Sequence, residues 1–169
     1  MKSLKNIKEM YRIRLIFIIF VLTFSSCTQR CLTEADQTQV LNKQIDNWHL
    51  SAAQADFEGY FSQLDESAIY IGTDASELWT KEEFINFSKP FFDRGKAWDF
   101  KSSHRNIYFT KENSMAWFDE LLETWMGPCR ASGVMTKTDF GWKIIHYQLS
   151  VTVPNEKMNS FLTVIQTQN

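Results

Sequence analysis

The 169-residue sequence has few cysteines, prolines and glycines and no excess of positive charge, and these shortages narrow its possible functions. Its three cysteines form neither a CxxC motif nor a Cys/His set with zinc spacing, so we expect no metal site. The sequence also lacks a Gly-rich phosphate loop and a serine–histidine motif. We therefore expect no cofactor either, and the sequence offers no motif for nucleotide or hydrolase chemistry.

Aromatic and apolar side chains are abundant in the sequence. Apolar residues make up 44% of the chain and aromatic residues 15%, with fourteen phenylalanines and six tryptophans. A chain of this length and composition can bury one substantial core, and no repeat, linker or low-complexity run interrupts it. These features predict a single domain with a core rich in aromatic rings.

The first 26 residues are typical of a secretory signal peptide. A basic segment precedes the apolar run 15–24, and two serines follow immediately before Cys27. At a helical rise of about 1.5 Å, ten apolar residues cross about half of a bilayer's hydrocarbon core. A retained N-terminal anchor helix is the alternative interpretation. The basic residues are Lys2, Lys5, Lys8, Arg12 and Arg14.

The segment 22–27, LTFSSC, resembles a bacterial lipobox, although Phe24 departs from the usual aliphatic residue. The resemblance implies cleavage before Cys27 and acylation of that cysteine, so we expect a lipid-anchored protein of the bacterial cell envelope that faces the periplasm. Loss of five basic residues and Glu9 would change the formal charge by −4, from −2 to −6. An acidic domain argues against a nucleic-acid partner. We expect a signal peptide at 1–26, a tether at 27–32 and a domain at 33–169.

Three helices are predicted in the first half of the domain. The first is capped by Thr33 and runs to about residue 53, the second starts at Asp56, and the third starts at Thr80. Thr80 and Glu83 form a capping-box pattern. Gly95 is suited to end the third helix, and Pro90 predicts a kink or an early end near residue 89.

Six strands are predicted, with the last four joined by short turns in a meander. The short hairpin covers 67–72 and 77–79, and the meander covers 97–110, 114–126, 128–138 and 142–153. The large apolar residues change parity within 97–110, which predicts a β-bulge between Ser102 and Arg105. Cys129 falls in a strand, and a disulfide with Cys31 is possible in an oxidising envelope but is not established by the sequence.

Turn chemistry sets the expected register of the meander. A three-residue loop 139–141 would pair Thr138 with Trp142 and Val134 with His146. A loop that starts with Gly127 would pair Trp125 with Arg130. One face then collects Trp117, Asp119, Glu123, Trp125, Arg130, His146, Gln148 and Ser150, and we expect it to line a pocket. The reverse face collects Phe118, Leu122, Tyr147, Leu149 and Val151, for packing or for a partner. A one-residue slip in either turn would exchange the two sets.

The order of these elements resembles the nuclear transport factor 2-like superfamily, and within it the SnoaL-like branch. The matching segments are 70–74, 79–84, 116–120, 130–134, 142–147 and 154–155, which span almost all of the mature chain. The resemblance implies an α+β, cone-shaped fold with three N-terminal helices packed on a curved mixed β-sheet, and commonly a homodimer through sheet surfaces. It implies no single chemistry, because the superfamily contains isomerases, dehydratases, cyclases and domains without a known reaction.

Candidate site residues follow from the pocket face and the aromatic residues. Enzymes of this superfamily place an acid–base Asp or His inside an apolar cone, and here Asp119 and His146 are the candidates. Arg130 would serve as an anion partner. The structural alternative is an ion-pair network of Asp119, Glu123 and Arg130, with His146 as a hydrogen-bonded core residue. The candidate ligand-binding residues are Trp48, Tyr60, Tyr70, Trp79, Trp117, Glu123, Arg130 and Gln148, with His49 beside them; each ring on its own is equally consistent with ordinary core packing.

Three functions remain open from the sequence. The first is binding of a small apolar or aromatic molecule without turnover. The second is a proton-transfer enzyme, such as an isomerase, dehydratase or cyclase, with Asp119 or His146 as the base. The third is a homodimeric interaction module that uses the apolar sheet face, with Phe118, Tyr147, Leu149 and Val151. In each case the only expected membrane contact is the lipid anchor.

Overall fold

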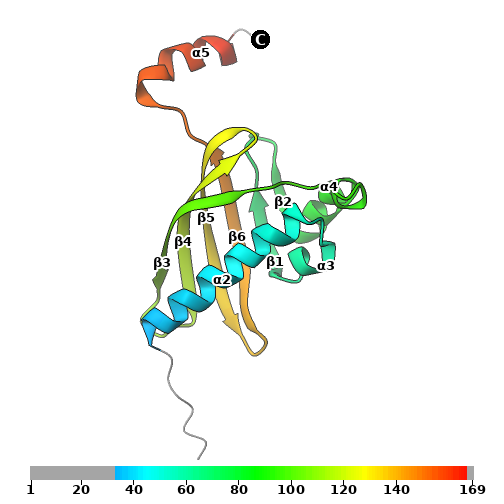
Figure 1. Cartoon of the computed structure of the whole chain (residues 1–169), viewed down its shortest axis with the longest axis vertical. Coiled ribbons are helices and arrows are strands. Elements are labelled where there is room, and N and C mark those ends of the chain that lie inside the picture. Colours follow the sequence, from blue (N-terminus) through cyan, green and yellow to red (C-terminus); the bar gives the residue numbers. More distant parts are fainter. Residues whose placement is uncertain (1–32, 167–169) are drawn as a thin grey trace, which may run out of the picture. The chain divides into compact units, whose positions relative to one another are not determined.

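The computed structural model describes residues 33–166. The chain divides into two units at Thr33, and the description below concerns the second, which begins at Glu34. The predicted signal peptide, Cys27 and Cys31 lie outside the described residues. Figure 1 shows the second unit, in which helices interleaved with a short hairpin precede a long meander of strands and a last helix.

The three predicted helices are present, as α2 (Glu34–Ala53), α3 (Phe57–Phe61) and α4 (Lys81–Asp93). Asp56 caps α3 by accepting a bond from the Gly59 N–H, and Thr80 and Glu83 form the predicted capping box on α4. Gly95 ends α4 with φ +73° in the left-handed region. Pro90 lies inside α4, so the early end near residue 89 is wrong. Burial of Ser88 and Phe92 on the same helix face holds the last turn in place despite the missing N–H.

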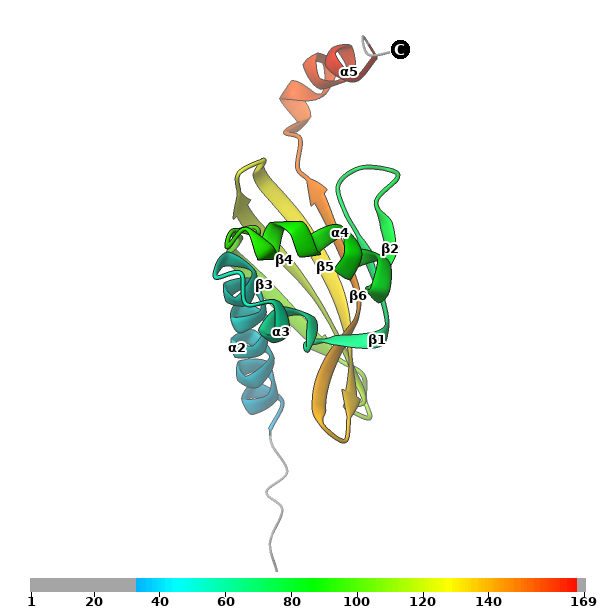
Figure 2. The same ribbon diagram turned by 90° about the vertical axis from the view of Figure 1, so that its right-hand side faces the viewer.

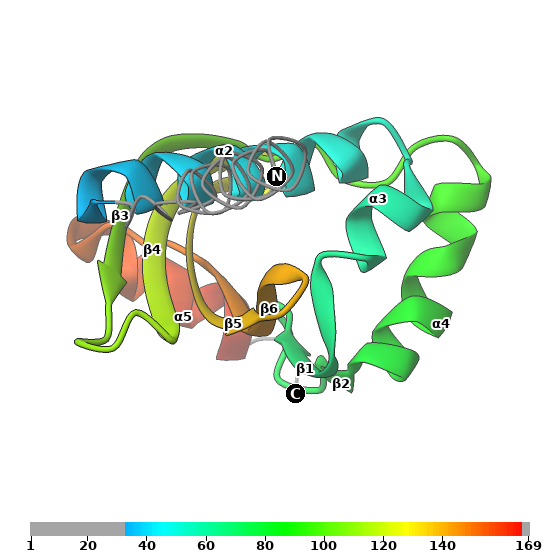
Figure 3. The same cartoon turned by 90° about the horizontal axis from the view of Figure 1, so that it is seen from below.

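The six strands form one mixed sheet in the order β2-β1-β6-β5-β4-β3. The first hairpin is β1 (Leu64–Ile71) with β2 (Leu78–Thr80), and β1 pairs parallel with β6 (Gly141–Val151). The meander adds β3 (Lys101–Phe109), β4 (Met115–Thr124) and β5 (Gly127–Thr138), all antiparallel. Figure 2 shows α2, α3 and α4 on one face of the sheet, and Figure 3 shows the sheet curving around them. This is the predicted α+β architecture.

Both hairpin loops of the meander differ from the prediction. Thr138 pairs with Gly141, so the second loop has two residues, Asp139 and Phe140, rather than three. A bulge then leaves Ile145 without a partner opposite β5, and it restores the predicted pairing of Val134 with His146. The first loop consists of Trp125 and Met126, so Asp119 pairs with Ser132 instead of Thr136. That shift is an even number of residues, which leaves each side chain on the face expected for it.

The helices cover the apolar face of the meander, not the face that was expected to line a pocket. Most buried side chains of the meander belong to the apolar set, including Phe118, Leu122, Tyr147 and Leu149, which pack in the core beneath the helices. Trp142 and Ile144 join them, because the bulge at Ile145 changes the parity of β6. The helices present apolar faces, so the sheet must turn its own apolar face toward them. The predicted dimer surface is therefore mostly core.

The other face of β3–β6 points away from the helices, and we call it the outer face. It carries Tyr108, Trp117, Asp119, Arg130, Ser132, Val134, His146 and Gln148, in register across the four strands. The predicted bulge in β3 lies between Ser102 and His104, as expected. A 3-10 turn (Asn155–Lys157) and α5 (Met158–Gln166) follow β6 and were not predicted. Among residues 33–166, no helix is both long and apolar enough to cross a membrane.

Candidate functional site

A cavity of about 220 Å³ opens between α4, the β1–β2 hairpin and the β4–β5 loop, and we call it the aromatic cavity. Eight of its fourteen lining residues are aromatic, which makes its wall mostly π-surface. They are Tyr70, Trp79, Phe84, Phe87, Phe91, Trp98, Phe100 and Trp125. The remaining lining residues are small or apolar apart from Thr73 and Glu77.

The sequence of α4 explains why rings gather at this place. Phe84, Phe87 and Phe91 recur at helical spacing, so they lie on neighbouring parts of one helix surface. Phe84 stacks on Tyr70 of β1, with ring centroids 3.8 Å apart, and Trp79 stacks on Phe87 at 4.5 Å. These stacked pairs connect the helix to the β1–β2 hairpin, and they form a fixed wall of the cavity.

The polar groups of the aromatic cavity are few. Burial raises the pKa of the Tyr70 phenol well above its usual value, so this hydroxyl stays protonated at neutral pH. The Glu77 carboxylate is half-buried, and its Oε2 accepts a bond of 3.1 Å from the Asp74 N–H. A mostly apolar pocket with a small number of placed polar groups is the usual form of a small-molecule site.

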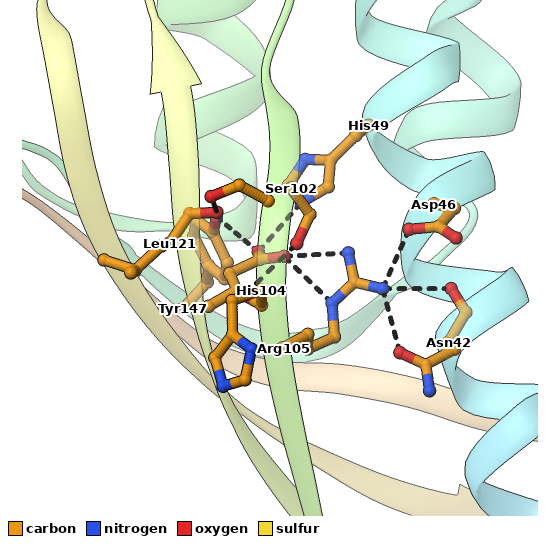
Figure 4. A network of polar contacts seen from close by, with 10 residues as sticks. Asn42, Asp46, His49, Ser102, His104, Arg105, Leu121 and Tyr147 are labelled. Atoms are coloured by element: carbon orange, nitrogen blue, oxygen red, sulfur yellow. Dashed lines mark hydrogen bonds and ion pairs between the residues drawn. The ribbon is translucent and has the colours of Figure 1, made fainter.

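A separate network of polar side chains lies between α2 and the sheet (Figure 4). Its hydrogen bonds converge on Glu120 of β4. His49 Nε2 donates to Glu120 Oε1 at 2.8 Å, and the Tyr147 hydroxyl donates to the same oxygen at 3.1 Å. Two guanidinium N–H groups of Arg105 donate to Oε2, at 2.8 and 2.9 Å. The Glu120 side chain is 0% exposed, so these four bonds replace its hydration shell.

Arg105 connects this carboxylate to the surface of α2. Its Nη1 donates to Asp46 Oδ1 at 2.8 Å and to two oxygens of Asn42 at 3.2 Å (Figure 4). The Arg105 side chain is 5% exposed, whereas that of Asp46 is 63% exposed. The guanidinium therefore sits between one fully buried carboxylate and one solvated carboxylate, with hydrogen bonds to both.

Charge and hydrogen bonding fix the protonation states of the network. Burial alone raises the pKa of Glu120, but the bonds and charges of His49 and Arg105 outweigh it and hold that pKa below the usual value of 4.5. Glu120 is thus an ionised acceptor, so His49 Nε2 carries the proton between them, and a neutral ring would be the Nε2–H tautomer. Burial, followed by the charge of Glu120, raises the pKa of Tyr147, so its hydroxyl remains a donor.

His49 also lines a second, more polar cavity of about 230 Å³ between α2 and the start of β3. Its other walls include Asp46, Asp99, Lys101 and Ser102. No hydrogen-bond partner of His49 Nδ1 is found among residues 33–166. Phe100 lines both cavities and separates them. In this tautomer, Nδ1 of the neutral imidazole is an acceptor that a molecule in the second cavity could reach.

The structure divides the predicted site residues into three groups. Tyr70 and Trp79 line the aromatic cavity, while Trp48 and Tyr60 are buried behind it and stack on each other at 5.0 Å. The remaining six lie on the outer face or at its edge: Trp117, Asp119, Glu123, Arg130, His146 and Gln148. Asp119 and His146 therefore lie on the opposite side of the sheet from the aromatic cavity and are not among its lining residues.

On the outer face, Arg130 pairs with Asp119 at 3.3 Å, which is one pair of the ion-pair network that the structural alternative expected. Arg130 and Gln148 also share a shallow hollow of about 180 Å³ with Ser132 and Ser150. Cys129, on the opposite face of β5, has a free and fully buried thiol. In the described part of the chain, no cluster of His, Cys, Asp and Glu side chains is suited to hold a metal ion.

Sequence reasoning missed Glu120 and Arg105. A signal was available, because Glu120 alternates with Phe118 and Leu122 and so interrupts an apolar strand face with a carboxylate. A buried carboxylate requires a partner. Arg105 is directly opposite Glu120 in the β3–β4 register, but the bulge in β3 hides that pairing from a simple count.

The family model of the SnoaL-like domain matches residues 41–154. The chain belongs to the SnoaL-like family. A search of curated proteins finds no significant match. Among solved structures, this SnoaL-like domain is similar to an NTF2-like protein of unknown function from Pseudomonas putida, with 12% identity and a TM-score of 0.59 over 75% of this chain and 94% of that one.

Two further solved structures extend the comparison. An NTF2-like protein from Cytophaga hutchinsonii has 19% identity and a TM-score of 0.58, covering 69% of this chain and 98% of its own. The association domain of C. elegans CaMKII has 20% identity and a TM-score of 0.58, covering 70% and 98%. At these identities the likeness establishes the nuclear transport factor 2-like fold of this SnoaL-like domain and leaves its chemistry open.

Proposed function

We propose that this protein is a lipid-anchored envelope domain that binds a small, largely aromatic molecule in the aromatic cavity without converting it. The observation that carries the proposal is the cavity itself, with eight aromatic side chains in its wall. Rigid ring walls bury a flat apolar ligand at little conformational cost. The lipobox-like segment that ends at Cys27 supports the anchor.

The volume limits the size of the ligand. A dry apolar cavity of about 150 Å³ can hold benzene, whereas drug-sized ligands usually occupy about 300–1,000 Å³. At about 220 Å³, the aromatic cavity suits a molecule with one ring and a small substituent. A fused-ring molecule of steroid size would not fit inside it.

The position of the ionisable groups favours binding over turnover. The aromatic cavity is lined by one carboxylate, Glu77, and one phenol, Tyr70, which stays protonated at neutral pH. The buried Glu120–His49 pair lies beyond Phe100. A ligand in the aromatic cavity therefore has Glu77 as its one candidate base, and the His49–Glu120 pair belongs to the other cavity.

Tryptophan fluorescence of the purified full chain tests the binding proposal. Phenol, indole and toluene should each give a saturable change, because Trp79, Trp98 and Trp125 line the cavity. Trp125→Ala should weaken binding several-fold without affecting the fold, since Trp125 is 83% exposed. Phe140→Ala is the matched control, an exposed ring at the tip of the other two-residue loop. The absence of any saturable change with all three compounds would contradict the proposal.

A second candidate function is proton transfer at the second cavity, and the Glu120–His49 geometry favours it. A carboxylate that fixes the imidazole tautomer leaves the other ring nitrogen as a positioned base. Incubation of the full chain with a small ketone in D₂O should then show deuterium uptake at its α-carbon by NMR. His49→Gln should abolish the exchange, while His104→Gln, at an exposed position on β3, should not. Equal rates in all three chains would remove this candidate.

The outer face supports a homodimer. Tyr108 and Trp117 stack at 5.6 Å and remain 43% and 46% exposed. Their strands lie next to β5 and β6, so the apolar pair belongs to a continuous four-strand surface. Exposed aromatic pairs on a sheet face mark interaction sites more often than isolated exposed residues do. We propose a second copy of the chain as the partner at this face.

A further inference from the structure

The aromatic cavity has a carboxylate but no basic side chain in its wall, and we infer that its ligand is an organic cation. The ligand class is an aromatic amine or a quaternary ammonium compound of one-ring size. This inference rests on the binding function proposed above and narrows the chemistry of the same site. The argument uses three observations: the ring wall, the fixed position of Glu77 and the balance of charge around the opening.

The ring wall favours a cation because the face of an aromatic ring carries negative electrostatic potential. A cation within about 6 Å of a ring centroid is attracted by that ring, and a wall of several rings offers several such contacts. One ring of this wall already attracts a cation of the chain itself, since the Arg94 guanidinium lies 4.9 Å from the Phe91 centroid. Arg94 is not among the residues that line the cavity.

Glu77 is held beside the cavity by its backbone and its carboxylate. The Gly72 N–H donates to the Glu77 carbonyl at 2.9 Å, and the Asp74 N–H donates to Glu77 Oε2 at 3.1 Å. The carboxylate lies so close to Gly72 that a Cβ at that position would be 2.1 Å from Oε2. Glycine therefore leaves the space that the carboxylate occupies. A fixed carboxylate next to rings can pair with the charge of a ligand whose apolar part contacts the rings.

Other charged side chains belong to the segments next to the residues that line the aromatic cavity. Asp74, in the same loop as Glu77, adds negative charge, whereas Arg94 and Lys96 at the end of α4 add positive charge. These three are exposed and screened by solvent, while Glu77 is half-buried and lines the cavity. Glu77 should therefore dominate the selectivity of the site. Arg94 should oppose it weakly, so Arg94→Gln should strengthen cation binding.

Two probes of the same shape and different charge test the inference directly. Phenyltrimethylammonium and tert-butylbenzene differ in the central atom of the substituent, nitrogen or carbon, and so in one positive charge. Titration of the full chain with each, followed by tryptophan fluorescence and ligand-observed NMR, gives both dissociation constants. We expect the cation to bind about tenfold more tightly, which corresponds to about 1.4 kcal/mol.

Glu77→Gln and Glu82→Gln make the same change of charge at two positions. Glu82 is exposed in the first turn of α4 and does not line the cavity. Glu77→Gln should reduce the preference for the cation to about threefold or less and leave tert-butylbenzene binding unchanged, which also shows that the variant is folded. Glu82→Gln should keep the full preference.

The outcomes separate this inference from the function on which it rests. A preference for the cation that Glu77→Gln reduces and Glu82→Gln retains supports the inference. Equal binding of both probes overturns it and leaves the apolar binding function standing. A preference that Glu77→Gln does not change overturns the role of Glu77. Binding of neither probe overturns both the inference and the binding function.

Discussion

Glu120 is the central acceptor of the polar network in the interior of the domain. Its carboxylate is fully buried and accepts bonds from His49, Tyr147 and Arg105. Glu120→Gln keeps the size of the side chain but leaves the buried guanidinium without its main counter-charge. We expect a loss of about 3 kcal/mol in the free energy of unfolding, because breaking one side of a buried ion pair typically costs that much. Urea denaturation measures it.

Glu123→Gln provides the control for this prediction. Glu123 lies on the same strand, three residues further on, and its side chain is exposed. The change from glutamate to glutamine at position 123 should alter the free energy of unfolding by less than about 0.5 kcal/mol. Similar losses in both variants would show that Glu120 has no special structural role.

The lowered pKa of Glu120 also predicts how stability depends on pH. A carboxyl whose folded pKa lies below its unfolded value stabilises the fold at pH above the unfolded value, which is 4.5 for glutamate. This stabilisation is lost as the pH falls from 4.5 through the folded pKa. The urea midpoint of the wild type should therefore fall in that range, and Glu120→Gln should lack this part of the decrease. A wild type and variant with parallel pH curves would contradict the assignment.

At the scale of elements, the close approach of β4, β5 and β6 depends on Gly133. A Cβ at this position would lie 2.5 Å from Phe118 Cζ and 3.1 Å from the His146 carbonyl oxygen. Phe118 is buried, so its ring cannot move away cheaply. We expect Gly133→Ala to lower the free energy of unfolding by about 1–3 kcal/mol. Ser132→Ala, one residue away on the outer face, should change it by less than about 0.5 kcal/mol. If thermal or urea denaturation shows no change in the free energy of unfolding for Gly133→Ala, the close approach of the strands does not depend on this glycine.

The helices and strands of this domain were predictable because their signals are local. The Thr80–Glu83 capping box, the Asp56 cap and the positive φ of Gly95 depend on residues within one turn of each other. The bulge in β3 was also visible as a change in apolar parity. Local chemistry of this kind is encoded within a few neighbouring residues, so a single sequence is enough to read it.

The orientation of the sheet was not predictable in the same way. Counting through turns grouped the residues of β4 and β5 onto the right faces, but it could not say which face the helices cover. The bulge at Ile145 has no local sequence signal, and it moves Trp142 and Ile144 to the buried side. The aromatic cavity depends on contacts between α4, the β1–β2 hairpin and the β4–β5 loop. Of its lining residues, Tyr70 and Trp79 were predicted ligand-binding residues and Trp125 was on the face expected to line a pocket; the others were not predicted, since such distant contacts follow from tertiary packing.

At the scale of the whole molecule, the outer face has the dimensions of a dimer interface. Strands of nine to twelve residues, at about 3.3 Å per residue and about 4.8 Å between strands, give a surface of roughly 30–40 Å by 15–20 Å, or roughly 450–800 Å². This is the scale of the ~800 Å² that each partner contributes to a standard interface. The cavity lies on the other side of the sheet, so a dimer through this face would leave both cavities open.

Trp117→Glu tests the dimer at the centre of this face. Each copy would then carry a carboxylate at this position, and the two like charges would repel each other across a two-fold interface. The substitution would also remove the ring that stacks on Tyr108. We expect light scattering to show twice the mass of one chain for the wild type and one chain for Trp117→Glu. Trp125→Glu makes the same substitution at a ring that lines the cavity, and it should stay dimeric while ligand binding weakens. A wild type that is monomeric at high concentration, or equal dissociation of both variants, would contradict the outer-face dimer.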